Sequence, residues 1–395
     1  MRESVVADVI IVGAGILGAS LAYHLVGRGV RDVVVLESRS VGGGSTCKSA
    51  AIVRMHYTNP ATVTLALRSR ELFLDWAGQI GASDAQQVYW RCGWFFLTPA
   101  DQQENVLANL AMNRQLGVDA SLVDHEFLCR QVPGIETDGL GLIVHEPDSG
   151  YADPVGVCQG LAQRAADGGA VIHGGVSVDA LLTDGDRVTG VCAGGQTYQA
   201  PITVVAAGAW TGKLTGDIGL DLAMDITREQ ELILDPVEPD FAPTVAISNM
   251  ADRFYLRPRP QGGLLVGRGY PKQYERVEPD NYKLDHDADF ADDILTRLVR
   301  RFPGLKDSKV RSGVVGLYTV TGDWHPILGP VASRPGLWLA TGGSGHAFKI
   351  GPAIGQMLAE LIVDGRCDWI EADRFNLARF ETGRIFESSY GANRA

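Results

Sequence analysis

The sequence of 395 residues predicts an α/β fold, in which a discontinuous Rossmann-like domain carries an inserted, mainly antiparallel-sheet domain. The first forty residues follow the order strand, glycine-rich turn, helix, strand, which is typical of dinucleotide-binding domains. Strand-like and helix-like apolar patterns alternate again over 142–210 and after 337, which favours a mainly parallel sheet covered by helices. Between 220 and 325, short alternating runs are broken by Pro and Gly, which favours an antiparallel sheet.

The glycine-rich turn follows the first apolar run. Gly13, Gly15 and Gly18 fit the pattern G-x-G-x-x-G between a predicted strand and a predicted helix. Gly13 permits a tight turn, Gly15 lets the backbone approach a pyrophosphate, and Gly18 lets the helix pack closely on the strand. The N-terminus of the helix then offers free N–H groups to phosphates.

Glu37 ends the second predicted strand, nineteen residues after Gly18. A carboxylate at this place can accept hydrogen bonds from two ribose hydroxyls and would repel a 2′-phosphate. The motif therefore predicts a dinucleotide without a 2′-phosphate, and by itself it leaves NAD and FAD open.

The remaining elements are predicted from periodicity. Helices are expected over 60–80, 100–115, 154–168 and 288–302, and after Lys349. Strands are expected at 94–97, 170–176 and 337–341, and within 142–152 and 202–210, each of which ends in a turn. A β-meander is expected over 177–200, and short strands at 232–234, 244–247, 254–256, 264–266 and 314–319. We expect a nucleotide-binding domain formed by 1–90, 150–218 and 326–395, and a substrate domain formed by 91–149 and 219–325.

Composition narrows the function classes. The chain is 45% hydrophobic and 21% charged, with a net charge of −12 and no basic stripe, which argues against nucleic acid and anionic membranes as partners. Its six cysteines are scattered without a C-x-x-C pair, so neither a zinc site nor a disulfide framework is expected. The first strand begins by about Asp8, and no apolar run reaches the roughly 18 residues of a membrane span. A cytoplasmic protein without bound metal is expected.

Four segments together resemble the D-amino-acid oxidase superfamily of FAD enzymes, in its branch of sarcosine oxidases, dimethylglycine dehydrogenases and glycine oxidases. They are Asp8–Glu37, Gly42–Arg54 with Leu65–Leu72, Val204–Trp210, and Leu339–Lys349. The likeness runs in order over nearly the whole chain, and it favours FAD over NAD.

The resemblance and the glycine motif together imply the cofactor contacts. They are Gly13, Gly15, Ile16, Leu17, Gly18, Glu37, Ser38, Gly44, Ser45, Thr46, Lys48, Ser49, Ala50, Val176, Ala207, Gly208, Trp210, Gly342, Gly343, Gly345, His346, Ala347 and Lys349. The last group opens a helix that, in this superfamily, approaches the pyrimidine edge of the flavin. A helix N-terminus there stabilises the negative charge of reduced flavin.

The resemblance also implies residues on the substrate side. Lys349 follows Gly-His-Ala-Phe, which matches the Gly-His-Gly-Phe-Lys of sarcosine-oxidase-like proteins, where the lysine binds the substrate carboxylate. Arg54 matches a second carboxylate-binding cation. Tyr255 and Tyr318 lie on strands where the family lines its pocket with aromatic rings. A structural ion pair for Arg54, a solvated helix position for Lys349 and ordinary sheet packing for the tyrosines remain as alternatives.

Three histidines have open roles. His346 lies in the glycine turn, either near the flavin or as a capped loop residue. His56 follows Arg54 by two residues, so both would face the same side of an extended segment. His325 is expected in a structural turn.

Two departures from the family affect the chemistry. Leu265 stands where monomeric sarcosine oxidases have a lysine that promotes the reaction with oxygen, and the strand before Tyr318 lacks their flavin-binding cysteine. Lys48 stands where relatives often carry Arg or His close to the flavin, and where some attach FAD through the histidine. A thioether at the neighbouring Cys47 is an alternative. Noncovalent FAD is expected, and the electron acceptor is either oxygen or another molecule.

The resemblance implies FAD-dependent oxidation of the C–N bond of an amino acid or N-methyl amino acid. Hydride transfer to flavin would give an imine that hydrolyses in water. The alternatives are a 2-hydroxy-acid oxidoreductase with His346 or His56 as base, a flavin subunit of a multi-subunit amine dehydrogenase, and a colourless NAD-dependent dehydrogenase. The expected partners are a small-molecule amine and an electron acceptor, and a homo-oligomer or a partner subunit is left open.

Overall fold

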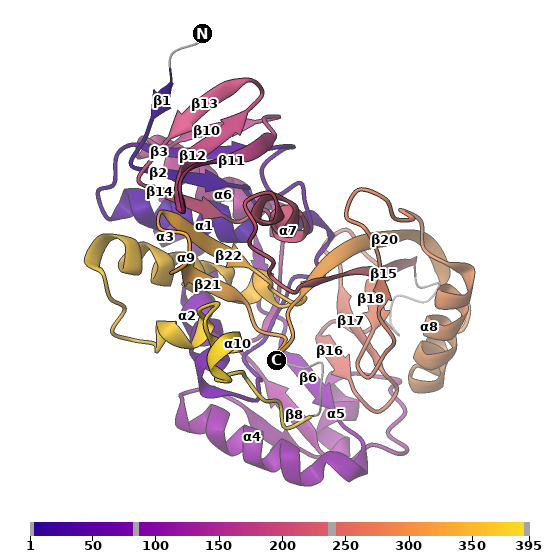
Figure 1. Cartoon of the computed structure of the whole chain (residues 1–395). Coiled ribbons are helices and arrows are strands. Elements are labelled where there is room, and N and C mark those ends of the chain that lie inside the picture. Colours follow the sequence, from indigo (N-terminus) through magenta and orange to yellow (C-terminus); the bar gives the residue numbers. More distant parts are fainter. Residues whose placement is uncertain (1–3, 82–86, 236–241, 391–395) are drawn as a thin grey trace.

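The computed structural model describes residues 4–81, 87–235 and 242–390. Figure 1 shows two large sheets, one covered by helices α1, α6 and α9, the other flanked by helix α8. The chain passes between these two parts several times, so segments far apart in the sequence meet at their junction.

Within these residues, six strands form the first sheet in the order β10-β3-β2-β14-β22-β21. The parallel strands are β2 (Val9–Val12), β3 (Val33–Glu37), β10 (Val171–Gly174), β14 (Ile202–Val205) and β22 (Leu337–Thr341), and β21 (Ile327–Pro330) runs antiparallel to β22. Alternate residues of β2 enter different cores, Val9 and Ile11 on one face, Ile10 and Val12 on the other. Strands buried on both faces are continuous apolar runs, as the sequence of β2 shows.

Helices cover one face of this sheet and a small sheet covers the other. The helices are α1 (Ile16–Gly27), α6 (Pro154–Asp167) and α9 (Ala347–Asp364), and α2 (Pro60–Leu74) packs on α9. The small sheet has the order β1-β13-β12-β11, formed by Val5–Val6, Gln196–Gln199, Arg187–Ala193 and Val178–Asp184. Helices α1 and α9 pack closely because Gly351 and Gly355 of α9 meet Ile16 and Ser20, where a Cβ would overlap the Ser20 side chain. This contact holds the N-termini of both helices at the same edge of the sheet.

The second large sheet has the order β19-β15-β18-β17-β16-β6-β8-β7, with β20 also paired to β15. Its strands are β6 (Trp94–Leu97), β7 (Ser121–Val123), β8 (Ile143–Glu146), β15 (Asp225–Asp235), β16 (Ala246–Asn249), β17 (Phe254–Pro258), β18 (Leu264–Arg268), β19 (Glu275–Arg276) and β20 (Lys309–Val320). All pairs are antiparallel except β16 with β6. Helix α8 (Ala288–Arg301) buries Ile294 and Leu298 against one face of the sheet. The other face points toward the first sheet.

Smaller elements complete the chain. A three-stranded sheet joins β4 (Ile52–Val53), β9 (Gly150–Ala152) and β5 (Tyr89–Trp90). The shorter helices are α3 (Trp76–Ile80), α4 (Gln103–Gln115), α5 (His125–Gln131), α7 (Thr211–Gly216) and α10 (Arg379–Thr382).

The predicted α/β fold class is confirmed, with local differences. The single helix expected over 60–80 is broken at Asp75, whose backbone leaves the helical region (φ −105°, ψ 35°). The segment 142–152, expected to be one strand ending in a turn, contains a second strand after that turn, so that β8 and β9 lie in different sheets. The expected two-domain division stays a prediction, and its outer ends at 1–3 and 391–395 lie outside the described residues. No helix within the described ranges is long and apolar enough to cross a membrane.

Candidate functional site

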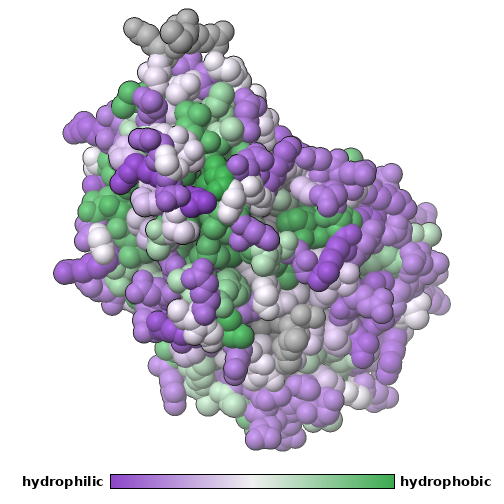
Figure 2. Space-filling model, viewed as in Figure 1, coloured by the Kyte–Doolittle hydropathy of each residue, from purple (hydrophilic) through white to green (hydrophobic). Residues whose placement is uncertain are grey.

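A cavity of about 820 Å³ opens at the carboxyl ends of the parallel strands and extends to the second sheet. It is lined by strand-end residues such as Val12, Glu37 and Thr341, and by Tyr255 and Tyr318 of the second sheet. In open α/β sheets ligands bind at this edge, and small-molecule sites measure roughly 300–1,000 Å³. Figure 2 shows a largely hydrophilic face, with hydrophobic side chains gathered toward its middle, between the parts built on the two large sheets.

The cavity brings together nearly all the site residues predicted from the sequence. Those that line it are Gly13, Gly15, Ile16, Leu17, Glu37, Ser38, Gly44, Ser45, Thr46, Lys48, Ser49, Ala50, Arg54, Val176, Ala207, Gly208, Trp210, Tyr255, Tyr318, Gly342, Gly343, Gly345, His346, Ala347 and Lys349. Gly18 lies beneath the turn, where a Cβ would overlap the carbonyl oxygen of Gly13. His56 lines a neighbouring cavity of about 150 Å³, and its Nε2 lies 2.8 Å from the hydroxyl of Tyr390. Their assigned roles stay predictions.

The glycine turn has the geometry of a phosphate cradle. Gly13 has φ +103°, and a Cβ there would lie 2.5 Å from the carbonyl oxygen of Ala206. Gly15 faces the hydroxyl of Thr46, which accepts a hydrogen bond of 3.2 Å from the N–H of Ile16. The first N–H groups of α1 lack intrahelical acceptors and point toward the cavity end of the helix. An anion is favoured there.

Glu37 is held in place by backbone groups. One carboxylate oxygen accepts from the N–H of Ala14 and the other from the N–H of Arg39, both at 2.8 Å. The Arg39-bound oxygen also accepts from the hydroxyl of Ser38 at 3.3 Å, the other oxygen retains a second acceptor position, and the residue lines the cavity. This arrangement fits a ribose of a dinucleotide.

A second helix N-terminus reaches the cavity from β22. The turn before α9 contains Gly342 and Gly345 with φ +71° and +81°. A Cβ on Gly345 would overlap the ring of Tyr318, so only glycine lets this ring lie against the turn. The first turn of α9 then presents N–H groups and the positive end of its dipole to the same cavity.

Two cations line the cavity beside this turn. The guanidinium of Arg54 donates to the carbonyl oxygen of His56 and lies 4.6 Å from the centre of the Tyr57 ring. Burial, and secondly the charge of Arg54, hold the pKa of the Lys349 ammonium well below its usual range. Among the residues that the structure describes, neither cation forms an ion pair with an acid. An anionic ligand group would supply the missing charge.

Acidic side chains on β15, which the sequence reasoning missed, face the same cavity. Glu229 is paired with Lys272, whereas Glu231 accepts a 2.7 Å hydrogen bond from the hydroxyl of Tyr255. Burial raises the pKa of Glu231 to about 7, although the Tyr255 hydrogen bond and nearby cations oppose the shift. Glu229 and Glu231 are two residues apart on a strand, and this spacing is the sequence signal that could have placed both on one face of the sheet.

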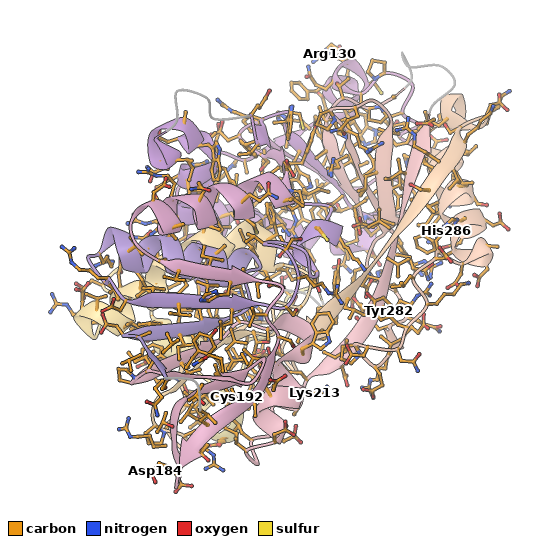
Figure 3. All side chains as sticks on the ribbon, turned by 90° about the horizontal axis from the view of Figure 1, so that it is seen from above. Arg130, Asp184, Cys192, Lys213, Tyr282 and His286 are labelled. Carbon is orange, nitrogen blue, oxygen red and sulfur yellow. The ribbon has the colours of Figure 1, made fainter. Side chains whose placement is uncertain are left out.

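Further charged residues line the cavity. Lys213 and Arg39 line the cavity near Trp210, whose ring lies 5.1 Å from the guanidinium of Arg39. The Nζ of Lys48 lies 3.1 Å from the hydroxyl of Tyr282. Figure 3 shows Tyr282 and Lys213 in the region between the two large sheets.

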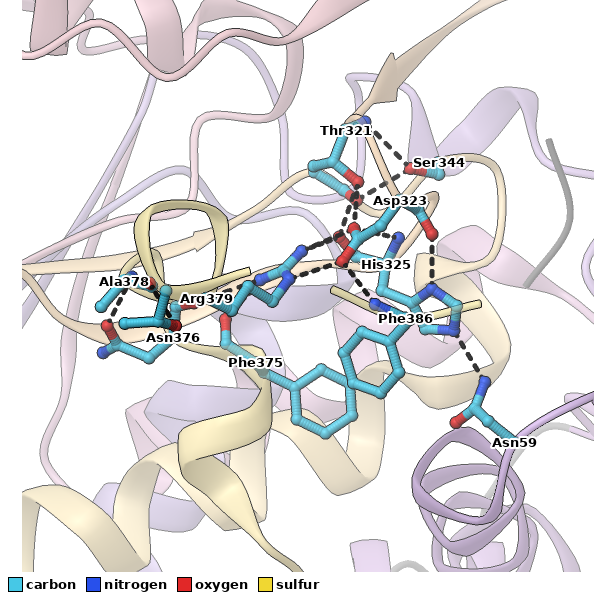
Figure 4. A network of polar contacts seen from close by, with 12 residues as sticks. Asn59, Thr321, Asp323, His325, Ser344, Phe375, Asn376, Ala378, Arg379 and Phe386 are labelled. Atoms are coloured by element: carbon cyan, nitrogen blue, oxygen red, sulfur yellow. Dashed lines mark hydrogen bonds and ion pairs between the residues drawn. The ribbon is translucent and has the colours of Figure 1, made fainter. Parts of the chain in front are cut away.

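His325 belongs to a structural network rather than to the cavity. It is fully buried, its Nδ1 lies 2.7 Å from the carbonyl oxygen of Asp323, and its Nε2 lies 2.8 Å from the amide of Asn59 (Figure 4). Arg379 binds both carboxylate oxygens of Asp323 in the same network. No group of three or more possible metal ligands occurs within residues 4–81, 87–235 and 242–390.

Comparisons with known proteins agree with this geometry. A family model described as FAD dependent oxidoreductase matches residues 8–361, which include every residue that lines the cavity. The chain is 27% identical to FAD-dependent oxidoreductase domain-containing protein 1 of Xenopus laevis, over 95% of this chain and 82% of that protein. It is 25% identical to sarcosine oxidase subunit beta of Rhodobacter capsulatus, over 98% and 91%. The solved structure of L-proline dehydrogenase from P. horikoshii matches with a TM-score of 0.88 and 25% identity, over 97% of this chain and 100% of that one.

Proposed function

Because the chain belongs to the family of FAD-dependent oxidoreductases, we propose that it oxidises the C–N bond of an amino acid or N-methyl amino acid to an imine. Membership confirms the resemblance seen in the sequence and the preference for FAD over NAD. FAD, when bound, supplies the acceptor for a hydride. Gly13, Gly15 and the N-terminus of α1 fit its pyrophosphate, Glu37 fits its adenosine ribose, and the N-terminus of α9 fits its flavin end.

The observation that carries the proposal is the pair of cations, Arg54 and Lys349, at the flavin end of the cavity. Neither forms an ion pair within 4 Å among the described residues, although Arg54 interacts with the more distant carboxyl of Glu146, and burial disfavours the charge of Lys349. A substrate carboxylate would satisfy both, and a hydrogen bond to a charged group contributes roughly 1.5–3 kcal/mol. A carboxylate held here would fix the orientation of the neighbouring α-carbon in the cavity.

The names of two relatives agree with such a substrate. Sarcosine and L-proline, named in the relatives described above, are both secondary amines with a carboxylate one carbon away. A primary amino acid presents the same carboxylate, so the proposal covers both kinds of amine.

We further propose that FAD is held without a covalent bond. Cys47 is exposed and its sulfur lies 3.1 Å from the carbonyl oxygen of Gly44, while the Nζ of Lys48 is directed to Tyr282. Denaturing the purified protein should release all of its flavin into the supernatant, and flavin that stays with the precipitate would contradict this proposal.

A 2-hydroxy acid is the second candidate, because it carries the same carboxylate. His346 lines the cavity and could act as the base that such a substrate needs. A third candidate is the flavin subunit of a multi-subunit amine oxidoreductase. The Rhodobacter capsulatus relative is named as a subunit of a sarcosine oxidase, and co-purification of a second chain would support this candidate.

An anaerobic titration of the purified protein tests the proposed function. The flavin absorbance is followed while glycine, sarcosine, L-proline, D-proline and L-lactate are added in turn. Bleaching by an amine supports amine oxidation, and readmitting air then separates an oxidase from a dehydrogenase. Bleaching by L-lactate alone, or by none of these compounds, would overturn the assignment.

A further inference from the structure

We propose that Glu231 binds the ammonium group of the substrate and takes one proton from it, so that the cavity selects zwitterionic amino acids. This inference rests on the proposed function and assigns the end of the substrate that Arg54 and Lys349 leave free. It predicts discrimination against 2-hydroxy acids, whose hydroxyl carries no charge.

The free oxygen of Glu231 is the first observation. The residue is 6% exposed and lines the cavity, and its Oε1 accepts the hydrogen bond from Tyr255. Its Oε2 is buried and accepts no hydrogen bond from any described residue. Leaving a buried polar atom unpaired costs about 1–3 kcal/mol, so an unpaired oxygen on a side chain that lines a cavity points to a ligand with a donor group.

The strands hold this carboxylate firmly. Glu231 of β15 lies opposite Gly267 of β18, and Gly267 lies opposite Tyr255 of β17. A Cβ on Gly267 would overlap the Tyr255 ring, so glycine lets the ring lie across β18 and reach Glu231 two strands away. The hydrogen bond on Oε1 therefore fixes the direction of Oε2.

The charges around the cavity match a zwitterion. Among the described residues, Arg54 and Lys349 form no ion pair with an acid within 4 Å, and Glu231 forms none with a cation. Glu229, two residues earlier on the same strand, differs because Lys272 neutralises it. Glu231 is thus the acid that a substrate cation can pair with.

The proton transfer balances without a further reactant. The N–H bond of the substrate ammonium breaks and an O–H bond forms at Oε2, while the electron pair remains on nitrogen. This neutral amine can then form the C=N bond as the α-hydrogen leaves with its electron pair to the acceptor that the family's chemistry supplies. Tyr255 stays hydrogen-bonded to Oε1 throughout.

The groups that face Glu231 set the pH at which it can act. They are Tyr255 and Arg257 from β17, Lys272 from the segment after β18, Glu229 from β15 itself and, hydrogen-bonded to Tyr255, Tyr318 from β20. Burial raises the pKa of the Glu231 carboxyl to about 7, while Tyr255 and the two cations oppose this shift. Amino-acid binding should therefore be full above pH 7 and fall as the pH drops below it.

Glu231→Gln tests the proposal, since it keeps the shape and the acceptor for Tyr255 but removes the negative charge. The flavin spectrum of wild type and variant is titrated anaerobically with the amine that bleaches the wild type, and separately with acetate. We expect the dissociation constant of the amino acid to rise at least tenfold, that of acetate to change less than twofold, and the acid limb near pH 7 to disappear. Asp235→Asn on the same strand, where Asp235 pairs with Arg311 outside the cavity, is the charge-matched control and should leave both constants unchanged.

Two outcomes would overturn the proposal. One is an unchanged affinity for the amino acid in Glu231→Gln, and the other is an equal loss of affinity for amino acid and acetate. Tyr255→Phe provides a second variant, because losing its hydrogen bond should move the acid limb of the profile to higher pH. A wild-type protein that no amine bleaches would contradict the proposed function itself, which is a different result from an insensitive variant.

Discussion

At the scale of single residues, the site depends on charged side chains that form no ion pair with any described residue. Lys349 is surrounded by protein that lowers its pKa, and Arg54 adds a like charge nearby. Two neighbouring cations in a desolvated site lower the stability of the fold, because like charges repel each other. Perturbed pKa values of this kind gather at functional sites.

Replacing Lys349 by Met should weaken substrate binding while FAD stays bound. Met keeps the length and apolar stem of Lys but removes the charge, so only the contact with a carboxylate is lost. We expect the dissociation constant of the bleaching amine to rise about tenfold to a hundredfold, or about 1.4–2.7 kcal/mol. The measurement is the anaerobic titration together with the flavin-to-protein ratio. Unchanged binding would remove Lys349 from the substrate site.

The sequence predicted some of these residues and could not predict others. Lys349 and Arg54 were found because each lies in a recognisable local motif. Glu231 was not, because the direction of its side chain depends on its register with Gly267 and Tyr255 across three strands. A local pattern does not contain such pairings.

At the scale of elements, the site depends on two helix N-termini that end at one sheet edge. Helix α1 begins after Gly15 and α9 after His346, and the close packing at Gly351 and Gly355 keeps them adjacent. Helix α1 was predicted from the glycine motif that precedes it, and α9 from its apolar periodicity. The break at Asp75 was missed, since a single non-helical residue barely disturbs the pattern.

Gly15→Val should give a folded protein that lacks FAD. A Cβ on Gly15 would lie 3.2 Å from the hydroxyl of Thr46, which can rotate away, so the protein itself can accommodate the side chain. The valine side chain would, however, occupy the space that a pyrophosphate needs. Gly18→Ala is the contrasting variant, since its Cβ would overlap the backbone of Gly13 and disturb the turn itself. Flavin content and circular dichroism distinguish the two effects, and normal FAD in Gly15→Val would contradict the assigned phosphate cradle.

Helix α2 should loosen in acid through His325. Asn59 caps the helix by accepting from the N–H of Thr62, so its amide nitrogen donates to Nε2 of His325, which must stay unprotonated. Burial, as the largest cause, lowers the pKa of His325 from 6.5 to about 4. The unfolded chain therefore binds this proton first, and stability present above pH 6.5 is lost as the pH falls toward 4, by about 3 kcal/mol for 2.5 pKa units.

Hydrogen exchange checks this assignment to α2. Exchange in the first turn of α2 should rise between pH 6.5 and 4 once intrinsic rates are corrected, and His325→Gln, which cannot take up the proton, should flatten the pH dependence of stability. His24 of α1 has a pKa lowered in the same way to about 4, so His24→Gln is the matched control that should leave exchange in α2 unaffected. Equal effects of the two variants on α2 would contradict the role of the cap.

At the scale of the whole molecule, the cavity exists because the two large sheets are joined at several points in the chain. Its lining comes from segments as distant as Val12 and Lys349. The α/β class followed from the alternation of patterns, but the parallel pairing of β16 with β6 connects strands about 150 residues apart and has no local signal. The whole arrangement is therefore less predictable than its parts.

A buried ion pair attaches the C-terminal segment to the rest of the structure. Arg379 donates to both oxygens of Asp323 at 2.7 and 2.8 Å, and each side chain is 1% exposed. Arg379 also donates to the carbonyl oxygens of His325 and Phe375, while Asp323 accepts from the N–H of Phe386. The pair thus ties residues 375–386 to the turn that precedes β21, as Figure 4 shows.

Arg379→Met should destabilise the whole molecule, because it leaves the Asp323 carboxylate buried without its counter-charge. Removing one partner of a buried pair costs about 3–5 kcal/mol, whereas an exposed pair contributes 0–1 kcal/mol. Arg384→Met in the same segment breaks the exposed pair with Glu371 and should change the unfolding free energy little. Denaturant unfolding followed by circular dichroism and by flavin release compares the two variants. If the ion pair stabilises the whole molecule, circular dichroism and flavin release will show the same lowered denaturant midpoint in Arg379→Met. Flavin loss at a lower denaturant concentration than unfolding would instead show that the C-terminal segment detaches by itself.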